Sequence, residues 1–533
     1  MPTHEVTNQP PVLEDDDLYH SDPLLDRLIT HHGAAHRAED LARFGRLAGS
    51  SQYRRWGTEA NRNLPTLRTH DRYGSRIDEV DSHPAWHHLL DASVSAGMHS
   101  VCWDDEPGGW VARAAFNYLD SQIEAGHWCP ISMTGAGVSS LRHQPDLAAI
   151  WEPLLTSNEY DPSPGPISGK RGALLGMGMT EKQGGSDVRA ITSYATPLAA
   201  DGEYLLTGHK WFTSAPMCDG FLVLAQTDGG LTCFLMPRWL EDGTRNPIRI
   251  QRLKDKLGNR SNASAELEFE DTWVRRVGDE GNGIRTIMEM VSATRLDCVA
   301  GSAALMRQAV SQGIHHSRHR RAFGSALIDK PLMRNVLADL EIEVRTALLL
   351  ALRLAASFDH SHADPREDGM RRILNPVAKY WVTKRAPIVV GEALECLGGN
   401  GYVEESGLPR LFRESPLNAI WEGSGNVIAL DVMRVLTRES DSAQILLHGI
   451  EESIGGHPAT DEFLAELRTE VSAPSEVSAR RITEKLAIAA IAGQLAACGE
   501  EALFDVFAAT RLAGDHGHLL GTLPAGLGTS GWF

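Results

Sequence analysis

Apolar and polar residues follow different spacings in successive parts of the chain, and each spacing predicts a different kind of element. From about residue 75 to 160 the apolar residues recur every three or four positions, as in 86–94 and 110–123, which is typical of amphipathic helices. A stretch rich in Pro, Ser and Gly, 157–170, then interrupts the pattern. We therefore expect an N-terminal helical domain over 51–172.

The spacing changes to two from about residue 173 to 280. Short runs rich in apolar residues are separated by Gly, Asp and Asn residues, as expected for strands joined by turns. These runs are 204–209, 221–225, 231–236 and 265–269. They predict a middle β domain over 173–280, built as a small barrel or sandwich.

The helical spacing returns at about residue 281 and persists. Three segments, 284–291, 297–310 and 336–358, are amphipathic and contain few Gly or Pro residues. A helical bundle over 281–440 is the simplest structure that buries their apolar faces. A further, mostly helical segment, 441–533, ends in a Gly-rich tail.

Residues 1–50 are polar and include an acidic run at 14–17, so we expect an extended arm that lies on another subunit. A chain of 533 residues is too long for one compact core. The resulting fold class is multidomain α+β. Its expected order is an N-terminal arm, a helical domain, a β domain, a helical bundle and an extra helical domain at 441–533.

Composition limits the classes of function. Apolar residues make up 42% and charged residues 23%, as in soluble globular proteins, and no run approaches the length of a membrane span. The start of the chain lacks the pattern of a secretory signal, and the seven cysteines contain no CxxC pair. We therefore expect a cytoplasmic protein with no membrane association. The net charge of −19 argues against a surface that coats DNA, although a local basic patch is compatible with it.

A glycine-rich segment, 179–187, follows the first expected strand of the β domain. Thr180 and Ser186 offer hydroxyl groups, and Gly185 follows another glycine, so the backbone can approach a ligand closely. Taken alone, a glycine-rich turn of a β domain is the simpler interpretation. The next strand ends in Trp211, Phe212, Thr213 and Ser214, of which Trp211 and Ser214 are candidates for ligand contacts and Phe212 could equally fill the edge of the barrel.

A second segment, 420–426, carries one carboxylate, Glu422, between an apolar pair and glycines. Such surroundings keep water away from a carboxylate and raise its pKa, which suits a general base. A helix N-terminal Glu stabilised by the helix dipole is the alternative.

The segment 315–324 contains three histidines and a cluster of arginines. No cysteine or carboxylate completes a metal site at ligand spacing, so we expect no metal. Arg320 is instead a candidate for a phosphate contact, because a guanidinium makes two parallel charge-assisted bonds with a pyrophosphate. A solvated basic helix face is the alternative.

The two motifs, in this order and at this separation, resemble those of the acyl-CoA dehydrogenase flavoproteins, and the resemblance covers the whole chain. Four stretches are similar to the longer, adaptive-response branch of that family, which adds a C-terminal helical domain; they are 176–188, 253–264, 294–298 and 415–426. The resemblance implies the acyl-CoA dehydrogenase fold, with a four-helix bundle after the β domain, and FAD as cofactor.

The resemblance also implies which residues hold FAD. The loop 179–187 would contact the isoalloxazine ring and the pyrophosphate, and the strand after it would cover one face of the flavin. Arg320 would reach the pyrophosphate bound by a neighbouring subunit, and the glycine-rich turn 395–402 would support the adenine end across the dimer. Most relatives have Gln where this chain has Glu395. The expected FAD contacts are Met179, Thr180, Gly185, Ser186, Trp211, Phe212, Ser214, Arg320, Phe323, Glu395, Gly398, Gly399, Ser424 and Asn426.

In the chemistry that the resemblance implies, Glu422 removes the α-proton of an acyl-CoA and the β-hydride passes to flavin N5. The backbone N–H of Glu422 would help to hold the thioester oxygen. Arg295 matches a basic residue near the active site. Some relatives place the base where this chain has Thr294, and a threonine cannot act as that base.

The resemblance implies a homotetramer, a dimer of dimers, with an electron-transfer flavoprotein as the electron acceptor. An alternative function is the binding of DNA in the response to alkylation damage. Residues 441–533 contain 13 Asp and Glu against 5 Lys and Arg, and this balance disfavours a phosphate-binding domain. A flavin oxygenase is a third possibility, disfavoured because it has no need of Glu422.

Overall fold

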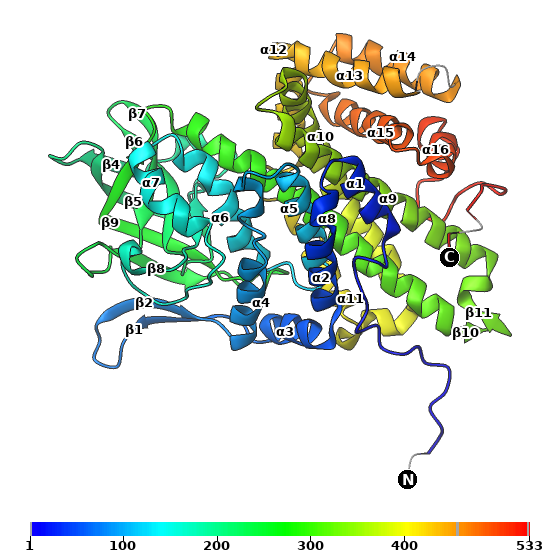
Figure 1. Ribbon diagram of the computed structural model, residues 1–533, viewed down its shortest axis with the longest axis horizontal. Coiled ribbons are helices and arrows are strands. Elements are labelled where there is room, and N and C mark those ends of the chain that lie inside the picture. Colours follow the sequence, from blue (N-terminus) through cyan, green and yellow to red (C-terminus); the bar gives the residue numbers. More distant parts are fainter. Residues whose placement is uncertain (1–2, 455–457, 530–531) are drawn as a thin grey trace. The chain divides into compact units, whose positions relative to one another are not determined.

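A computed structural model describes residues 3–454, 458–529 and 532–533 (Figure 1). Contacts between Cα atoms divide the chain into two compact units. The first contains Met1–Ser50, Trp110–Ile123 and Arg295–Phe533, and the second contains Ser51–Gly109 and Glu124–Thr294. Neither unit is one continuous stretch, so each is assembled from segments that lie far apart in the sequence.

The second unit is built on a seven-stranded sheet that contains the four predicted strands. Neighbouring strands follow the order β3-β6-β4-β5-β9-β7. An additional pairing of β6 with β7 closes the strands from β6 to β7 into a ring, and β8 pairs with β9 outside this path. The strands are β3 (Leu175–Gly178), β4 (Tyr194–Pro197), β5 (Glu203–Ser214), β6 (Gly220–Thr227), β7 (Gly230–Pro237), β8 (Ile248–Leu253) and β9 (Ser264–Val277).

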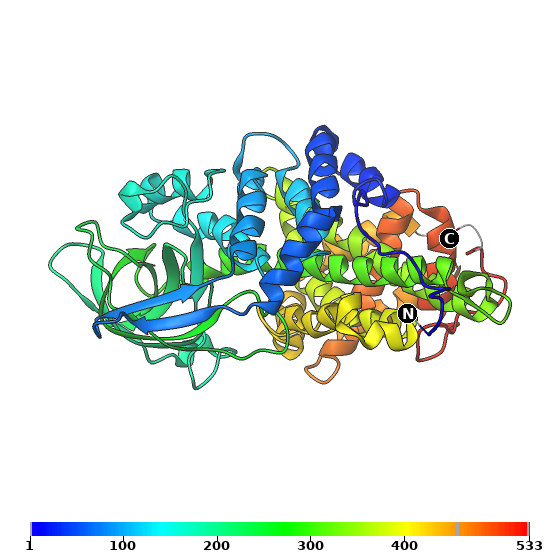
Figure 2. The same cartoon turned by 90° about the horizontal axis from the view of Figure 1, so that it is seen from below.

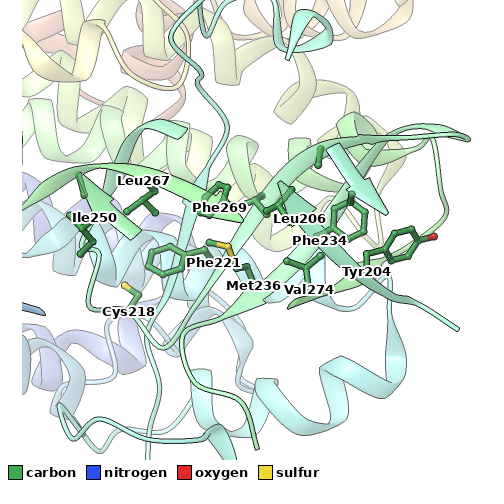
Figure 3. Packing of buried hydrophobic residues seen from close by; sticks show 14 of the residues in the cluster. Tyr204, Leu206, Cys218, Phe221, Phe234, Met236, Ile250, Leu267, Phe269 and Val274 are labelled. Carbon is green, nitrogen blue, oxygen red and sulfur yellow. The ribbon is translucent and has the colours of Figure 1, made fainter. Parts of the chain in front are cut away.

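The inward faces of these strands form one apolar core (Figure 3). Phe221 and Met236 pair across β6 and β7, and Leu206 of β5 and Leu267 and Phe269 of β9 belong to the same buried cluster. The apolar runs predicted these strands, but β6 and β7 are buried on both faces and not on one alternating face. The predicted barrel-like β domain is confirmed.

A β-hairpin precedes this sheet in the same unit and was not predicted. It consists of β1 (Thr66–His70) and β2 (Arg76–Asp81), within a region predicted to be helical. Figure 2 shows it as the blue pair of strands along the sheet. Asp78 of this hairpin accepts a 3.1 Å hydrogen bond from the backbone N–H of Ile250 in β8. The helical expectation fails here because the segment is mostly polar, and its strands are stabilised by pairing with each other. The remaining helices of this unit are α3 (Ser51–Arg62), α4 (Pro84–Ser95), α6 (Trp128–Leu141) and α7 (Pro145–Leu155).

Long helices dominate the first unit and confirm the predicted bundle. The segments predicted as two helices, 284–291 and 297–310, form one continuous helix, α8 (Gly283–His319). The other bundle helices are α5 (Gly109–Asp120), α9 (Pro331–His360), α10 (Pro365–Glu395), α11 (Leu408–Glu414) and α12 (Gly425–Arg438). Buried Arg113 of α5 forms a 2.7 Å ion pair with Asp297 of α8, so these two helices are joined by charge as well as by apolar packing.

The prediction of an extended arm over 1–50 is wrong for much of that segment. It contains α1 (Pro23–His31) and α2 (Ala38–Gly49), which bury apolar residues spaced as on one helix face. Asp22, just before α1, accepts a 2.7 Å bond from the hydroxyl of Tyr118. The polar composition of the segment concealed this periodicity, and the helices belong to the same compact unit as the bundle.

The segment 441–533 also belongs to the unit that contains the bundle. Its helices are α13 (Ser440–Ile454), α14 (Pro458–Ser472), α15 (Ala479–Ala497) and α16 (Glu501–Phe507). The apolar side of α15 is buried and contacts α9, α10, α12 and α13. Among the described residues, no helix combines the length and apolar character needed to cross a membrane.

Candidate active site

Glu422 lies on a short loop between a 3₁₀ turn, Leu417–Ala419, and the start of α12. Its φ angle is 56°, and that of the following residue, Gly423, is 105°. A left-handed conformation is unfavourable for a glutamate by about 1–3 kcal/mol, so neighbouring groups must hold the loop in this shape. The glycine after Glu422 removes the same cost at the next position.

Two cationic side chains hold the backbone of this loop. Lys379 Nζ, on α10, donates to the carbonyl of Trp421 at 2.8 Å and also to the carbonyl of Gly423. Arg295 Nε, on α8, donates to the carbonyl of Glu422 at 3.0 Å. Three successive carbonyls are therefore satisfied by two cations, which leaves the carboxylate of Glu422 outside this set of bonds.

Arg295, one of the two cations that bind the loop, also pairs with the carboxylate of Asp431. Arg295 Nη1 lies 2.7 Å from one carboxylate oxygen of Asp431, and Arg372 Nη2 lies 2.9 Å from the other. Burial opposes ionisation of Asp431, but the two arginines outweigh it and lower its pKa. Asp431 therefore stays charged and fixes the guanidinium of Arg295.

Lys379 is only 1% exposed, and this burial has an electrostatic consequence. Burial, with a smaller contribution from Arg295, lowers the pKa of Lys379 to about 8. Cys298 lies close enough to influence this lysine, and burial raises the pKa of its thiol. Lys379 and Cys298 are therefore poorly hydrated, whereas the loop residues 421–423 are half-buried.

Other residues of this region that were considered from the sequence do not contact the two cations through their side chains in the bonds described above. Ser424 and Asn426 are exposed at the start of α12. Trp421 Nε1 donates to Asn418 at 2.8 Å, which orders the residue before Glu422. The hydroxyl of Thr294 donates to the carbonyl of Val291 within its own helix.

In the other unit, the glycine-rich loop 179–187 is fastened to strand β5. The backbone N–H of Trp211 donates to the carbonyl of Thr180 at 2.8 Å. The next residue, Glu181, is fully buried and accepts 2.8 Å and 2.7 Å bonds from Lys210 Nζ and the backbone N–H of Thr192. The structure thus brings together the two segments that the sequence predicted as flavin contacts, with Thr180 beside Trp211.

The buried ion pair between Glu181 and Lys210 was not recognised in the sequence. Burial alone raises the pKa of Glu181, but Lys210 and the surrounding N–H donors reverse the effect and lower it to about 2. The pair ties the loop to β5 through its side chains as well as its backbone. A glutamate inside a glycine-rich turn and a lysine in an alternating strand were weak signals, because both are usually solvated.

The shape of this region fits a flavin. A Cβ atom at Gly185 would lie 2.5 Å from Thr180 Oγ1, and one at Gly178 would lie 3.1 Å from Thr213 Oγ1, so glycine at these positions lets the backbone pack closely against the two threonines. The hydroxyl oxygen of Thr213 is buried and has no hydrogen-bond partner in the described part of the chain. Phe212, in contrast, is 49% exposed. An unsatisfied hydroxyl and exposed aromatic surface together suit a flat ring with polar edges.

The remaining predicted FAD residues lie in the first unit. Phe323 is 99% exposed at the tip of a two-stranded hairpin formed by β10 (Arg321–Ala322) and β11 (Ser325–Ala326). Arg320, before this hairpin, donates from Nη1 to the carbonyl of Asn8 at 2.6 Å. Glu395 ends α10, and a Cβ atom at Gly398 or Gly399 would meet open space.

The sequence did not reveal Lys379 and Asp431, which support the Glu422 loop. Lys379 lies in the apolar stretch 376–380 of α10, and a lysine in such a stretch was the only local signal. Asp431 is one of many carboxylates on amphipathic helices. Their partners come from distant parts of the chain, so no spacing rule connects them.

Models of known protein families match most of the chain. The model described as the adaptive response protein AidB N-terminal domain matches residues 8–162. The acyl-CoA dehydrogenase middle domain matches 176–272, and the acyl-CoA dehydrogenase C-terminal domain matches 281–437.

Individual relatives agree with these matches. The AidB protein of Escherichia coli (strain K12) is 45% identical over 496 residues, which cover 92% of this chain and 91% of the relative. Acyl-CoA dehydrogenase family member 11 of Caenorhabditis elegans is 33% identical over 474 residues, 84% of this chain and 75% of the relative.

Solved structures agree as well. A crystal structure of C. elegans ACDH-11 in complex with C11-CoA superposes with a TM-score of 0.84 at 28% identity, covering 96% of this chain and 91% of that one. The apo-form of Bd2924 gives a TM-score of 0.85 at 27% identity, covering 93% and 100%. The chain therefore belongs to the acyl-CoA dehydrogenase family of FAD-dependent oxidoreductases, in its AidB branch.

Proposed function

We propose that this protein is an acyl-CoA dehydrogenase in which Glu422 is the base that removes the substrate's α-proton. The observation that carries the proposal is the clamp on the loop 421–423, in which Arg295 and Lys379 bind three successive backbone carbonyls. A loop whose backbone is held at three successive carbonyls presents the Glu422 side chain in a defined direction. That is the condition for a positioned base.

The surroundings of Glu422 support this role. Its Oε2 atom is shielded from solvent, and the loop around it is held by the buried Lys379. Water competes for a substrate proton less well in such surroundings than at the surface. Arg295 acts on the reaction indirectly, as a positioning residue, because it binds the backbone of Glu422 and not its carboxylate.

The loop 179–187 and strand β5 are the proposed site of the flavin ring, since the buried, unsatisfied hydroxyl of Thr213 and the exposed ring of Phe212 suit it. When bound, FAD supplies the acceptor for the β-hydride. Met179, Thr180, Ser186, Trp211, Phe212 and Ser214 would line the ring, and Ser424, Asn426, Glu395, Gly398 and Gly399 would contact other parts of FAD. Arg320 and Phe323 would serve a neighbouring subunit, in a homotetramer built as a dimer of dimers.

An acyl thioester is the proposed substrate. The similar C. elegans protein was crystallised with C11-CoA, which supports an acyl-CoA with a fatty chain. An electron-transfer flavoprotein is the proposed acceptor of the electrons. Light scattering of the FAD-loaded protein tests the assembly, and a flavin-loaded monomer would contradict it.

Anaerobic titration with a panel of acyl-CoAs tests the proposed reaction directly. Bleaching of the oxidised flavin absorption on addition of one class of acyl-CoA is the expected result. A flavin-loaded protein that no acyl-CoA bleaches would contradict the proposal. Chains of different length and branching in the panel also define the substrate class.

DNA binding in the response to alkylation damage is the alternative function; the family model that matches residues 8–162 is named for an adaptive response and supports no more than that part of it. The balance of 13 acidic against 5 basic residues over 441–533 disfavours that segment as the DNA-binding surface. We propose instead that the segment serves assembly and packing, because α15 buries its apolar side.

A further inference from the structure

Three side chains of types that can bind a metal ion, from segments near the two ends of the chain, lie close together in the first unit. The ligand atoms of His31, His32 and Cys498 all lie within 4.8 Å of one another. His31 and His32 end the first helix, and Cys498 follows the end of α15. Because these residues are far apart in the sequence, no ligand spacing marks them as a set.

Two helices end at this cluster, which favours a cation. The backbone N–H of His32 donates to the carbonyl of Leu28 at the end of α1, and that of Cys498 donates to the carbonyl of Gln494 at the end of α15. The C-terminal end of a helix carries a partial negative charge. The cluster lies at the C-terminal ends of two helices, which lowers the energy of a positive ion there.

The ring of His32 supplies a suitable ligand atom. Its Nε2 atom is buried and has no hydrogen-bond partner within the described residues. The rings of His31 and His32 meet edge to face with centroids 4.9 Å apart. A buried ring nitrogen without a partner carries a cost that a metal ion removes.

Two charged groups near the cluster, Arg353 and Glu500, are each engaged in an ion pair. Arg353, which acts electrostatically on both His32 and Cys498, forms two bonds of 2.9 Å and 3.0 Å with Glu367. An ion pair of 2.7 Å between Arg27 and Glu500 joins α1 to the turn after Cys498. The first helix is therefore held close to the end of α15 whether or not an ion is bound.

We propose that His31, His32 and Cys498 form a Zn²⁺ site with water as the fourth ligand, which links the first helix to the C-terminal helical segment. Two imidazoles and a thiolate are ligands that Zn²⁺ prefers, and three protein ligands with one water are a common coordination. Bonds of about 2.0–2.3 Å place the ligand atoms of a tetrahedral site about 3.3–3.6 Å apart. The exposed ring of His31 can turn inward by the small distance required, and the Cys498 thiol proton leaves to solvent as the Zn–S bond forms.

The test uses the full-length FAD-loaded protein, freed of metal by a chelator that is then removed. Titration with ZnCl₂ in a calorimeter measures stoichiometry and affinity. Co²⁺ difference spectra, with the flavin absorption subtracted, report a sulfur ligand. We expect one Zn²⁺ per chain and a thiolate-to-cobalt absorption band.

Two variants, His31→Gln and Cys498→Ser, each remove one ligand. Losing a partner of a ligand already costs 10–100-fold in affinity, so losing a ligand itself should cost at least about a hundredfold. His36→Gln and Cys102→Ser are matched controls outside the cluster and should bind as the parent does. His31 is exposed, so its variant keeps the fold and makes the test decisive even if Cys498→Ser is unstable.

Absence of saturable Zn²⁺ binding to the parent protein would overturn the proposal. Equal affinity of the parent and His31→Gln would overturn it as well, because the ion would then bind elsewhere on the surface. Neither result depends on dehydrogenase activity, so the outcome is separate from that of the proposed reaction.

Discussion

The guanidinium of Arg295 donates from Nε to the backbone carbonyl of Glu422 at 3.0 Å, while its Nη1 lies 2.7 Å from Asp431. One side chain therefore joins the loop of the proposed base to a buried carboxylate on α12. The left-handed backbone of Glu422 is maintained by this bond and by Lys379, and its carboxylate takes no part in either. The direction of the proposed base is thus determined by residues that need not touch the substrate.

Replacing Glu422 by glutamine should leave FAD bound and slow the reduction of flavin by acyl-CoA at least about a hundredfold, the usual contribution of a positioned base. Stopped-flow absorption under anaerobic conditions measures this rate. Glu484→Gln, at an exposed glutamate of α15, is the matched control. Equal rates in Glu422→Gln and the parent would place the base elsewhere.

Replacing Arg295 by alanine should slow the same step by tens of fold, up to about 100-fold, because the loop loses one of its two cations and Glu422 is displaced. The matched control is Arg372→Gln, since Arg372 also pairs with Asp431. We expect this control to keep most of the rate. If both variants are equally slow with unchanged KM, the charge of Asp431 matters and not the bond to Glu422.

The stability of the protein should depend on Lys379 between pH 8 and about 10.4. Burial lowers the pKa of Lys379 to about 8 in the folded protein, against about 10.4 for an unfolded lysine. In this window the unfolded chain holds a proton that the folded protein has lost, so stability rises with pH, by about 3 kcal/mol in all.

Melting temperatures of the parent and Lys379→Met, measured in parallel from pH 7.5 to 11, test this dependence. The difference between the two proteins should shift in favour of the parent as the pH rises through the window. Lys330→Met is the matched control and should follow the parent. A constant difference between the parent and Lys379→Met would show that the lysine has the same pKa in both states.

Replacing Gly185 by alanine should weaken FAD binding at least about tenfold, equivalent to about 1.4 kcal/mol. The added methyl group would lie 2.5 Å from Thr180 Oγ1 and force the side chain toward the proposed flavin. Quenching of flavin fluorescence on reconstitution measures the affinity. Gly169→Ala, where an added Cβ meets open space, is the control. Unchanged affinity in Gly185→Ala would argue that the flavin does not approach this loop.

The full-length protein should bind duplex DNA more weakly than about micromolar at near-physiological salt, because such affinity depends on Lys and Arg that neutralise phosphates. Fluorescence anisotropy of a labelled duplex measures this. Micromolar or tighter binding would show that a local basic patch outweighs the net charge. Arg318→Ala and Arg321→Ala would then test the exposed arginines near the end of α8 as that patch.

Local patterns in the sequence determined the strands, the long helices and the two candidate segments. The alternation at 204–209 and 265–269 predicted strands because side chains on a strand point alternately to opposite faces. The turn 420–426 was recognised because its glycines and its carboxylate are neighbours in the chain. The family resemblance depended on the same short-range features.

Interactions between distant residues were decided only by the tertiary structure. The helices of 1–50 escaped recognition because most of their surface is polar and only a narrow apolar stripe is buried. The bonds from Lys379 to the Glu422 loop, and the meeting of His31 with Cys498, join residues that no spacing rule connects. From the sequence, a charged side chain is interpreted as solvated. Which charged groups lose their water and gain a partner depends on contacts between distant residues, and local sequence patterns do not show these contacts.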